Sequence, residues 1–261
     1  MKSAFLFQIR ALAVNVWLEA LRDKLLQLLI VSGMVVITCS LILGNMAVGG
    51  HERIIQSTGF WAMGIWGLMA VIYLGSNMLK KEIQQKTIYL VLSRPVNRPV
   101  FLIGKFAGMI LVLGTVFPVL SIVWLMVLQF SGIEIHLQHL VALGFIFIEW
   151  ILLAAFSLFF TTFTSPMLHN LFLVGLTFMG HWSNDLNRMA ETGVKEEWIK
   201  ILLKAIYYIL PNLDALNFRS EAIHDLMIHG SILLNGLVIW FFWTATIFVG
   251  ANLIFLQRKV V

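Results

Sequence analysis

The sequence alternates between long runs without charged side chains and short polar segments. No Asp, Glu, Lys or Arg occurs between Lys24 and Glu52, and none occurs between Arg53 and Lys80. A helix needs about 20 predominantly apolar residues to cross the hydrocarbon core of a bilayer. The pattern therefore predicts an all-α, polytopic membrane protein with six transmembrane helices. We place them at about 25–46, 59–79, 101–130, 139–163, 167–182 and 230–256.

One apolar region is too long for a single crossing. Between Glu134 and Asp185 the only charged residue is Glu149. The sequence TTFTSP at 161–166 interrupts this region, and a proline next to a cluster of hydroxyl side chains is typical of a turn. We therefore expect two helices that meet at this turn.

The first 23 residues carry charges, yet their apolar positions repeat at helical spacing. Gaps of four, three, four and four residues place these positions on one face of a helix. The spacing favours an amphipathic helix over 1–23 that lies on the membrane surface. A helical extension of the first span is the alternative. The apolar positions are Phe5, Ile9, Leu12, Val16 and Ala20.

Composition supports a protein that faces lipid. Hydrophobic residues make up 60% of the chain and charged residues 12%, whereas soluble domains average about 25% charged residues. The net charge of +5 is typical of a membrane protein whose Lys and Arg concentrate in the cytoplasm, so nucleic acid is not an expected partner. Most Lys and Arg lie in segments that the six spans place on the same side of the membrane as the N-terminus. Because Lys and Arg concentrate on the cytoplasmic side, this distribution predicts that both termini are cytoplasmic. The single cysteine, Cys39, excludes an internal disulfide.

The sizeable cytoplasmic loop lies at about 80–100 and leads into the third span. Its sequence, EIQQKTIYLVLSRPVNRPVFLIGK at 82–105, allows a helix up to Ser93, which Pro95 ends. Asn97 can cap the next helix. The pattern predicts a short, rigid element between two spans. The alternative is a basic collar that only reflects the excess of positive charge in cytoplasmic loops.

This segment resembles the cytoplasmic segment of ABC-2 type permeases. In that family an acidic residue and a Thr precede a Leu-Ser-x-Pro turn, and an Arg and Leu-(Leu/Ile)-Gly-Lys follow at the start of the third span. The six-span plan agrees, and LPNLDALNF at 210–218 is similar to the Pro-containing segment before the last span. The matching residues are Glu82, Thr87, Leu92, Ser93, Pro95, Arg98, Leu102, Ile103, Gly104 and Lys105.

The resemblance implies one ABC-2 transmembrane domain over 1–261, with a coupling helix at 80–100 that docks on a cytosolic P-loop ATPase subunit. The other implied partners are the lipid bilayer and a second permease, either a copy, as a homodimer, or a paralogue. The chain has no GxxxxGK[ST], so ATP and Mg are expected in the ATPase subunit, with no cofactor and no enzyme activity in this chain. The implied function is export across a bacterial inner membrane. The implied ATPase-contacting residues are Glu82, Thr87, Ser93, Arg94, Pro95, Arg98 and Lys105.

Glu149 is the candidate polar residue inside the membrane. It lies in FIFIEWILL, in the middle of the fourth predicted span. An acid at that depth costs about 2.5–3.5 kcal/mol on insertion scales, so it should face protein or water. One interpretation is a residue that lines the translocation pathway or relays protons. The other is a structural carboxyl group bonded to a neighbouring helix.

The longest polar stretch, 183–229, is expected on the outer side of the membrane. Its apolar positions between 194 and 209 repeat at helical spacing, with Glu196 and Lys200 as an i, i+4 pair on the opposite face. This helix lies on the outer leaflet in one interpretation; in the other, which the resemblance implies, it belongs to an outer gate. Pro211 is expected to stop the helix. The gate residues would be Pro211, Asn212 and Asp214.

Two further patterns carry less information. His136 and His139 lie three residues apart beside Glu134, but no third ligand is fixed nearby, so no metal site is expected. Gly104 and Gly108 form a GxxxG pair, which lets membrane helices approach closely.

Three functions therefore have to be compared. The first is the permease subunit of an ATP-driven exporter. The second is a scaffold subunit of an ABC-type complex that energises assembly or maturation rather than solute transport. The third is a membrane-embedded enzyme, which would need a nucleophile and a base at working distance. The sequence contains neither HExxH nor GxSxG, and it does not specify the cargo of a transporter.

Overall fold

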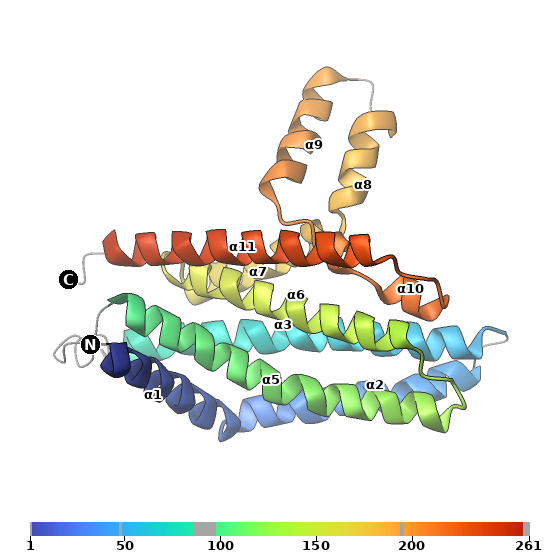
Figure 1. Ribbon diagram of the computed structural model, residues 1–261, viewed down its shortest axis with the longest axis horizontal. Helices are drawn as coiled ribbons and strands as arrows, with labels where there is room; N and C mark the ends of the chain where they lie inside the picture. Colours follow the sequence, from blue (N-terminus) through green and yellow to red (C-terminus); the bar gives the residue numbers. More distant parts are fainter. Residues whose placement is uncertain (1, 47–48, 86–97, 194–195, 258–261) are drawn as a thin grey trace.

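Every regular element in the computed structural model is a helix, within the residues that it describes, 2–46, 49–85, 98–193 and 196–257 (Figure 1). Within the described part of the chain, five helices are long and apolar enough to cross a membrane, which confirms the expected class of all-α membrane protein. They are α2 (Lys24–Met46), α3 (His51–Gln85), α5 (Arg98–Phe130), α6 (Leu137–Thr161) and α11 (Gly230–Gln257).

The other helices are shorter or less apolar. The N-terminal helix α1 comes before the first candidate span, and the remaining elements lie between α6 and α11. They are α1 (Lys2–Leu21), α7 (Pro166–His181), α8 (Ser183–Arg188), a π-helical turn (Met189–Gly193), α9 (Glu197–Ile209), a 3-10 turn (Asp214–Leu216) and α10 (Arg219–Ile223).

Helix α7 occupies the position of the fifth predicted span. It has 16 residues, fewer than the roughly 20 that a perpendicular crossing needs, and it is not among the five candidate spans. Pro166 begins the helix, as the TTFTSP turn predicted, because its fixed φ and missing N–H suit a first helical position. Six crossings therefore stay a prediction.

The long helices lie side by side in one bundle, and the two chain ends lie at the same end of it (Figure 1). Helix α6 is central, since 67% of its most apolar stretch is buried inside the chain, against 6% in α11. The fully buried indoles of Trp124 and Trp150 fill the space between α3, α5 and α6. Helices α8 and α9 form a hairpin that projects away from the bundle, across the direction of the long helices (Figure 1).

Three glycines allow the neighbouring helices to approach α3 closely. Gly59, Gly67 and Gly75 are spaced eight residues apart along α3, and each meets a different side chain of a neighbouring helix. A Cβ atom at Gly59 would overlap the indole of Trp124, and one at Gly67 would overlap the indole of Trp150. A Cβ atom at Gly75 would overlap the hydroxyl of a serine on α6. Small residues at such positions are typical of helix contacts in membranes.

The GxxxG pair of α5 packs against α1. A Cβ atom at Gly104 would lie 2.7 Å from the Cβ of Leu12, and one at Gly108 would lie 2.7 Å from the Cβ of Val16. Part of the apolar face predicted for α1 is thus covered by protein, while Phe5 at its start is 42% exposed. That α1 lies on the membrane surface stays a prediction.

We expect Gly108→Leu to separate α1 from α5, because a larger side chain would overlap Val16. Overpacking a tight contact typically costs about 1–3 kcal/mol. Disulfide cross-linking between cysteines placed on α1 and α5 would measure the contact, and we expect its yield to fall. Gly114→Leu is the control, since the nearest atom to a Cβ there is 4.0 Å away. Equal cross-linking in both variants would contradict the prediction.

Candidate functional site

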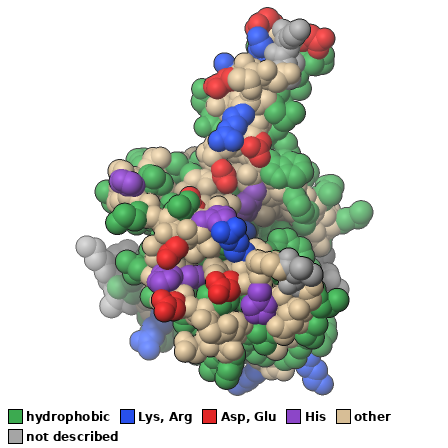
Figure 2. All heavy atoms as spheres, turned by 90° about the vertical axis from the view of Figure 1, so that its right-hand side faces the viewer, with side chains coloured by type: hydrophobic (Ala, Val, Ile, Leu, Met, Phe, Trp, Pro, Cys, Tyr) green, Lys and Arg blue, Asp and Glu red, His purple; other side chains and the backbone are tan. Residues whose placement is uncertain are grey.

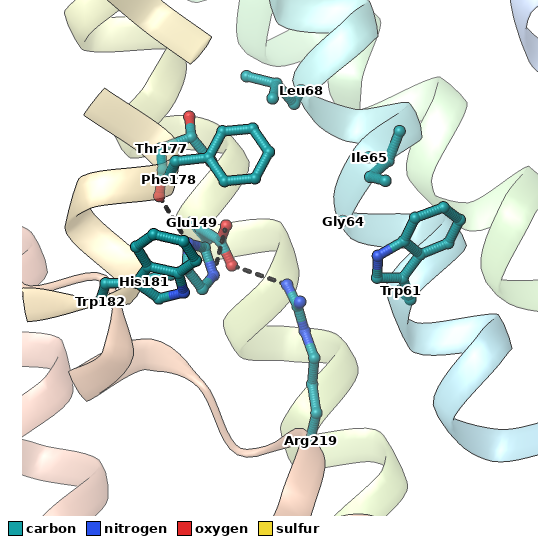
Figure 3. A pocket seen from close by; sticks show the side chains of 10 residues that line it. All are labelled: Trp61, Gly64, Ile65, Leu68, Glu149, Thr177, Phe178, His181, Trp182 and Arg219. Atoms are coloured by element: carbon teal, nitrogen blue, oxygen red, sulfur yellow. Dashed lines mark hydrogen bonds and ion pairs between the residues drawn. The ribbon is translucent and has the colours of Figure 1, made fainter. Parts of the chain in front are cut away.

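A cavity of about 330 Å³ lies between α3 and α7, with Glu149 at its floor (Figure 3). Aromatic side chains stand around it, and three of them are largely exposed: Trp61 at 58%, Phe178 at 60% and Trp182 at 62%. Aliphatic side chains of α3 complete the wall. The lining residues are Trp61, Gly64, Ile65, Leu68, Glu149, Thr177, Phe178, His181, Trp182 and Arg219.

Two basic side chains contact the carboxylate of Glu149, which is 2% exposed. Arg219 Nη2 donates to Glu149 Oε2 at 3.1 Å, and His181 Nε2 lies 3.4 Å from Glu149 Oε1 (Figure 3). A buried carboxylate is tolerated when such partners compensate its lost hydration. Of the two interpretations of Glu149, the contacts fit the structural carboxyl group, and its position in a cavity also fits a residue that lines the translocation pathway.

One hydrogen bond of His181 fixes the position of one ring proton. Nδ1 is 3.0 Å from the backbone carbonyl of Thr177, and a carbonyl oxygen only accepts, so Nδ1 carries a hydrogen. Nε2 lies 3.4 Å from Glu149 Oε1. The imidazole is charged only when Nε2 also carries a proton, and it then stands beside Glu149 as a second cation with Arg219.

Local structure brings these three residues together from distant parts of the chain. His181 is the last residue of α7, and Arg219 is the first residue of α10. The segment between them returns to α7 because Leu213 N–H donates to the Gly180 carbonyl at 3.1 Å. Gly64 on α3 leaves room for the guanidinium group, since a Cβ atom there would lie 3.0 Å from Arg219 Nη2.

The predicted gate residues lie close to this cavity, in the segment that holds Arg219. Asn212 donates from Nδ2 to Asn184 Oδ1 at 3.1 Å, and Asn184 Nδ2 donates to Asp214 Oδ2 at 2.6 Å. The Asn212 side chain also accepts from the backbone N–H of Ala215 at 3.1 Å. Helix α9 ends at Ile209, just before Pro211, as expected. The network fixes the segment against the start of α8.

The predicted ATPase-contacting residues are only partly covered by the structure. Thr87, Ser93, Arg94 and Pro95 lie outside the described residues, as does the side chain of Glu82, whose backbone belongs to α3.

The last two of these residues lie near the start of α5. Arg98 Nη1 donates to the carbonyl of Leu256 at 3.0 Å and is 3.4 Å from that of Phe255, so it caps the C-terminus of α11. Lys105 Nζ lies 4.3 Å above the ring of Phe101. This region and the Glu149 cavity are separate sites.

The predicted pairing on α9 is wrong in one detail. Lys200 Nζ donates to Glu197 Oε1 at 2.9 Å instead of to Glu196, because Glu196 is the N-cap with extended backbone and the helix begins only at Glu197. The hydrogen bond from Lys200 lowers the pKa of the exposed Glu197 carboxyl group. The apolar face of α9 is as open as the sequence suggested, with Trp198 at 67% and Ile201 at 66% exposed.

The end of the bundle opposite the chain ends is polar. Histidine and acidic side chains gather there (Figure 2). His139 is buried, and its Nδ1 accepts from the His136 backbone N–H at 3.1 Å, so the hydrogen lies on Nε2, which donates to Gln56 Oε1 at 3.1 Å. His136 Nε2 lies 3.4 Å from Asp225 Oδ2. Within the described residues no group of three or more metal-ligating side chains forms.

Sequence reasoning missed a second buried polar cluster, between α3, α6 and α7. Ser157 Oγ and His169 Nε2 are 2.9 Å apart, and His169 Nδ1 is 2.9 Å from Asn170 Oδ1. Ser76 of α3 also donates to Asn170 Oδ1. The arrangement resembles a nucleophile and a base, but Ser157 and His169 are both 0% exposed. It therefore joins three helices, and no sequence motif marks it in advance.

Sequence missed the partners of Glu149 for a similar reason. Arg219 is 70 residues from Glu149 and sits in a polar loop, where a basic residue carries no special signal. His181 lies at the end of the short apolar run 167–182, where no local pattern indicates an acidic partner.

The fold and the cavity together define a helical integral membrane protein with a cavity lined by charged and aromatic side chains. The family model described as ABC-2 family transporter protein matches residues 14–192. This match covers more than half of the chain, from α1 to the turn after α8, so the chain belongs to the ABC-2 transporter family. Among curated proteins, none matches the chain.

Proposed function

We propose that the chain is the permease subunit of an ATP-driven ABC exporter. A separate cytosolic P-loop ATPase hydrolyses ATP with Mg, and a second permease copy completes the transporter. The chain lies in a bacterial inner membrane with both termini cytoplasmic, α7 as a short fifth crossing, α1 on the membrane surface and an outer gate built on Pro211, Asn212 and Asp214. The family match over residues 14–192 is the observation that carries the proposal.

The contacts at the end of the bundle near the chain ends support coupling through the loop between α3 and α5. Asp23, at the turn between α1 and α2, accepts a hydrogen bond of 3.3 Å from Asn77 Nδ2. Asn77 lies on α3, the helix that leads into that loop. After the loop, Arg98 holds the end of α11, and Gly104 and Gly108 hold α1. A force on the loop would therefore reach the three neighbouring helices α1, α2 and α11 through direct contacts.

The test is a pull-down of the tagged chain from its native membrane in mild detergent, with the co-purifying proteins identified. We expect a P-loop ATPase at a near 1:1 ratio. Glu82→Lys should reduce its recovery at least about tenfold, because placing a like charge at an interface costs several kcal/mol. ATP hydrolysis by the complex should fall in parallel.

Lys200→Glu on α9 is the matched control, since it reverses one charge on the projecting hairpin and should leave the ATPase bound. Arg98→Glu should also uncouple the complex, but it removes the cap of α11 as well and is the less specific variant. If no ATPase co-purifies, or if Glu82→Lys retains it fully, the proposed function is wrong and the scaffold and enzyme alternatives have to be tested.

A further inference from the structure

We propose that the cavity above Glu149 is a binding site for an amphipathic anion, a molecule with a carboxylate or phosphate group on an apolar chain or ring. The inference does not rest on the ATP-coupled function, because the site lies wholly within this chain and its binding is measurable without ATP. It rests on three properties of the cavity: its net charge, its unused donors and its apolar wall.

The floor holds two basic side chains against one acid. Glu149 is the acid among the lining residues, and Arg219 and His181 both lie against it. Glu149 compensates the charge of Arg219, so a protonated His181 brings the three groups to a net charge of +1. An uncompensated buried charge is costly, and an anion in the cavity would neutralise it. A cation would add to the same charge and should bind weakly.

The basic groups also have unused hydrogen-bonding capacity. Arg219 offers five N–H donors, and its hydrogen bond to Glu149 uses Nη2. Among the described residues, the buried Arg219 Nε has no hydrogen-bond partner, and the 3.4 Å contact of His181 Nε2 with Glu149 is not a hydrogen bond. Buried donors without partners are rare, so an anionic oxygen is the group that this floor lacks. Arginine is well suited to such oxygens because its donors lie in a planar fork.

The apolar side chains of the cavity wall favour a ligand whose anionic group is attached to an apolar chain or ring. Trp61, Phe178 and Trp182 stand around the opening, and Ile65 and Leu68 lie deeper on α3 (Figure 3). Ligand cavities typically combine such apolar walls with a few polar groups that fix orientation. A volume of about 330 Å³ holds the head and first part of such a molecule, and the rest would leave between the exposed aromatic rings. The source is either a membrane lipid with an anionic head group or a soluble amphiphile.

The experiment measures quenching of Trp61 and Trp182 by brominated probes, using the full chain in neutral detergent. Bromo-undecanoate is the anionic probe, and bromo-undecyl trimethylammonium is its matched cation. The signal from the cavity is the part that disappears in a variant with Trp61→Phe and Trp182→Phe. We expect saturable quenching by the anion, with affinity about tenfold or more above that of the cation, the factor expected for one charge-assisted hydrogen bond.

Variants separate recognition of the charge from general damage. Glu149→Gln frees the guanidinium group and should strengthen anion binding, while Glu149→Gln combined with Arg219→Gln should abolish it and keep the chain folded. Arg188→Gln, on the exposed end of α8, should have no effect. Equal affinity for the anion and the cation, or full anion binding by the double variant, would overturn the proposal.

A parallel measurement identifies the source of the anion. The chain is placed in nanodiscs of phosphatidylcholine, with or without brominated phosphatidylglycerol. Quenching of the same two tryptophans by the brominated lipid, again lost in the double variant, assigns the site to a lipid head group. Quenching by bromo-undecanoate but not by the lipid assigns it to a soluble amphiphile. Quenching by neither overturns the proposal.

Discussion

Gly67→Val is expected to leave little folded protein. A Cβ atom at Gly67 would overlap atoms of the Trp150 indole, which is 0% exposed. The indole has no room to move, because the ring of Phe117 contacts it edge-on with centroids 5.3 Å apart. Overpacking typically costs about 1–3 kcal/mol and occasionally more, and a branched side chain at so close a contact belongs at the upper end of that range. Gel filtration after heating in detergent would measure the fraction that stays monodisperse.

Matched glycines elsewhere in the bundle separate packing from helix propensity. Gly144 on α6 and Gly175 on α7 have no atom within 4 Å of a Cβ position, so Val at either should be tolerated. Shortening the partner should rescue the fold: Gly67→Ala combined with Trp150→Leu should be more stable than Gly67→Ala alone. If Gly67→Val were as stable as Gly144→Val, the close packing of α3 on α6 would be incorrect.

The sequence predicts the long helices well because one physical rule governs them. Helices that cross a bilayer need uninterrupted apolar residues, and charges such as Lys24 and Glu52 mark their limits directly. The turn before α7 was also predictable, since Pro166 constrains its own backbone. The length of α3 was underestimated, because its helix continues through polar residues to Gln85, beyond the predicted boundary near residue 79.

Contacts between helices were much harder to predict. The spacing of Gly104 and Gly108 indicated a close approach but not the partner, which is α1 rather than another long span. A GxxxG pair indicates only that another helix can approach closely, and it does not specify which helix that is. In the same way, an acid at position 149 required a partner, yet nothing local identified Arg219, because a loop residue reaches the cavity only after the chain has folded back. The cavity is therefore a property of tertiary structure.

Arg219→Gln is expected to be the most damaging single substitution in the cavity. It removes the hydrogen-bonded cation from Glu149, whose carboxylate is 2% exposed, and leaves the imidazole of His181, 3.4 Å away, as its remaining basic neighbour. Breaking a buried ion pair by removing one partner typically costs about 3–5 kcal/mol, because the remaining charge stays desolvated. Thermal stability in neutral detergent would show the loss. Arg188→Gln, which removes an exposed arginine from α8, should leave it unchanged.

The decisive comparison is with the double variant Glu149→Gln plus Arg219→Gln. If the cost of Arg219→Gln comes from an unpaired buried charge, removing that charge should restore most of the stability, so the double variant should be more stable than Arg219→Gln alone. Residues in direct contact often show coupling of about 0.5–3 kcal/mol in such cycles. Simple addition of the two single effects would mean that Glu149 and Arg219 do not interact. Recovery of stability without recovery of anion binding would instead show that the pair compensates charge in the fold while Arg219 provides recognition.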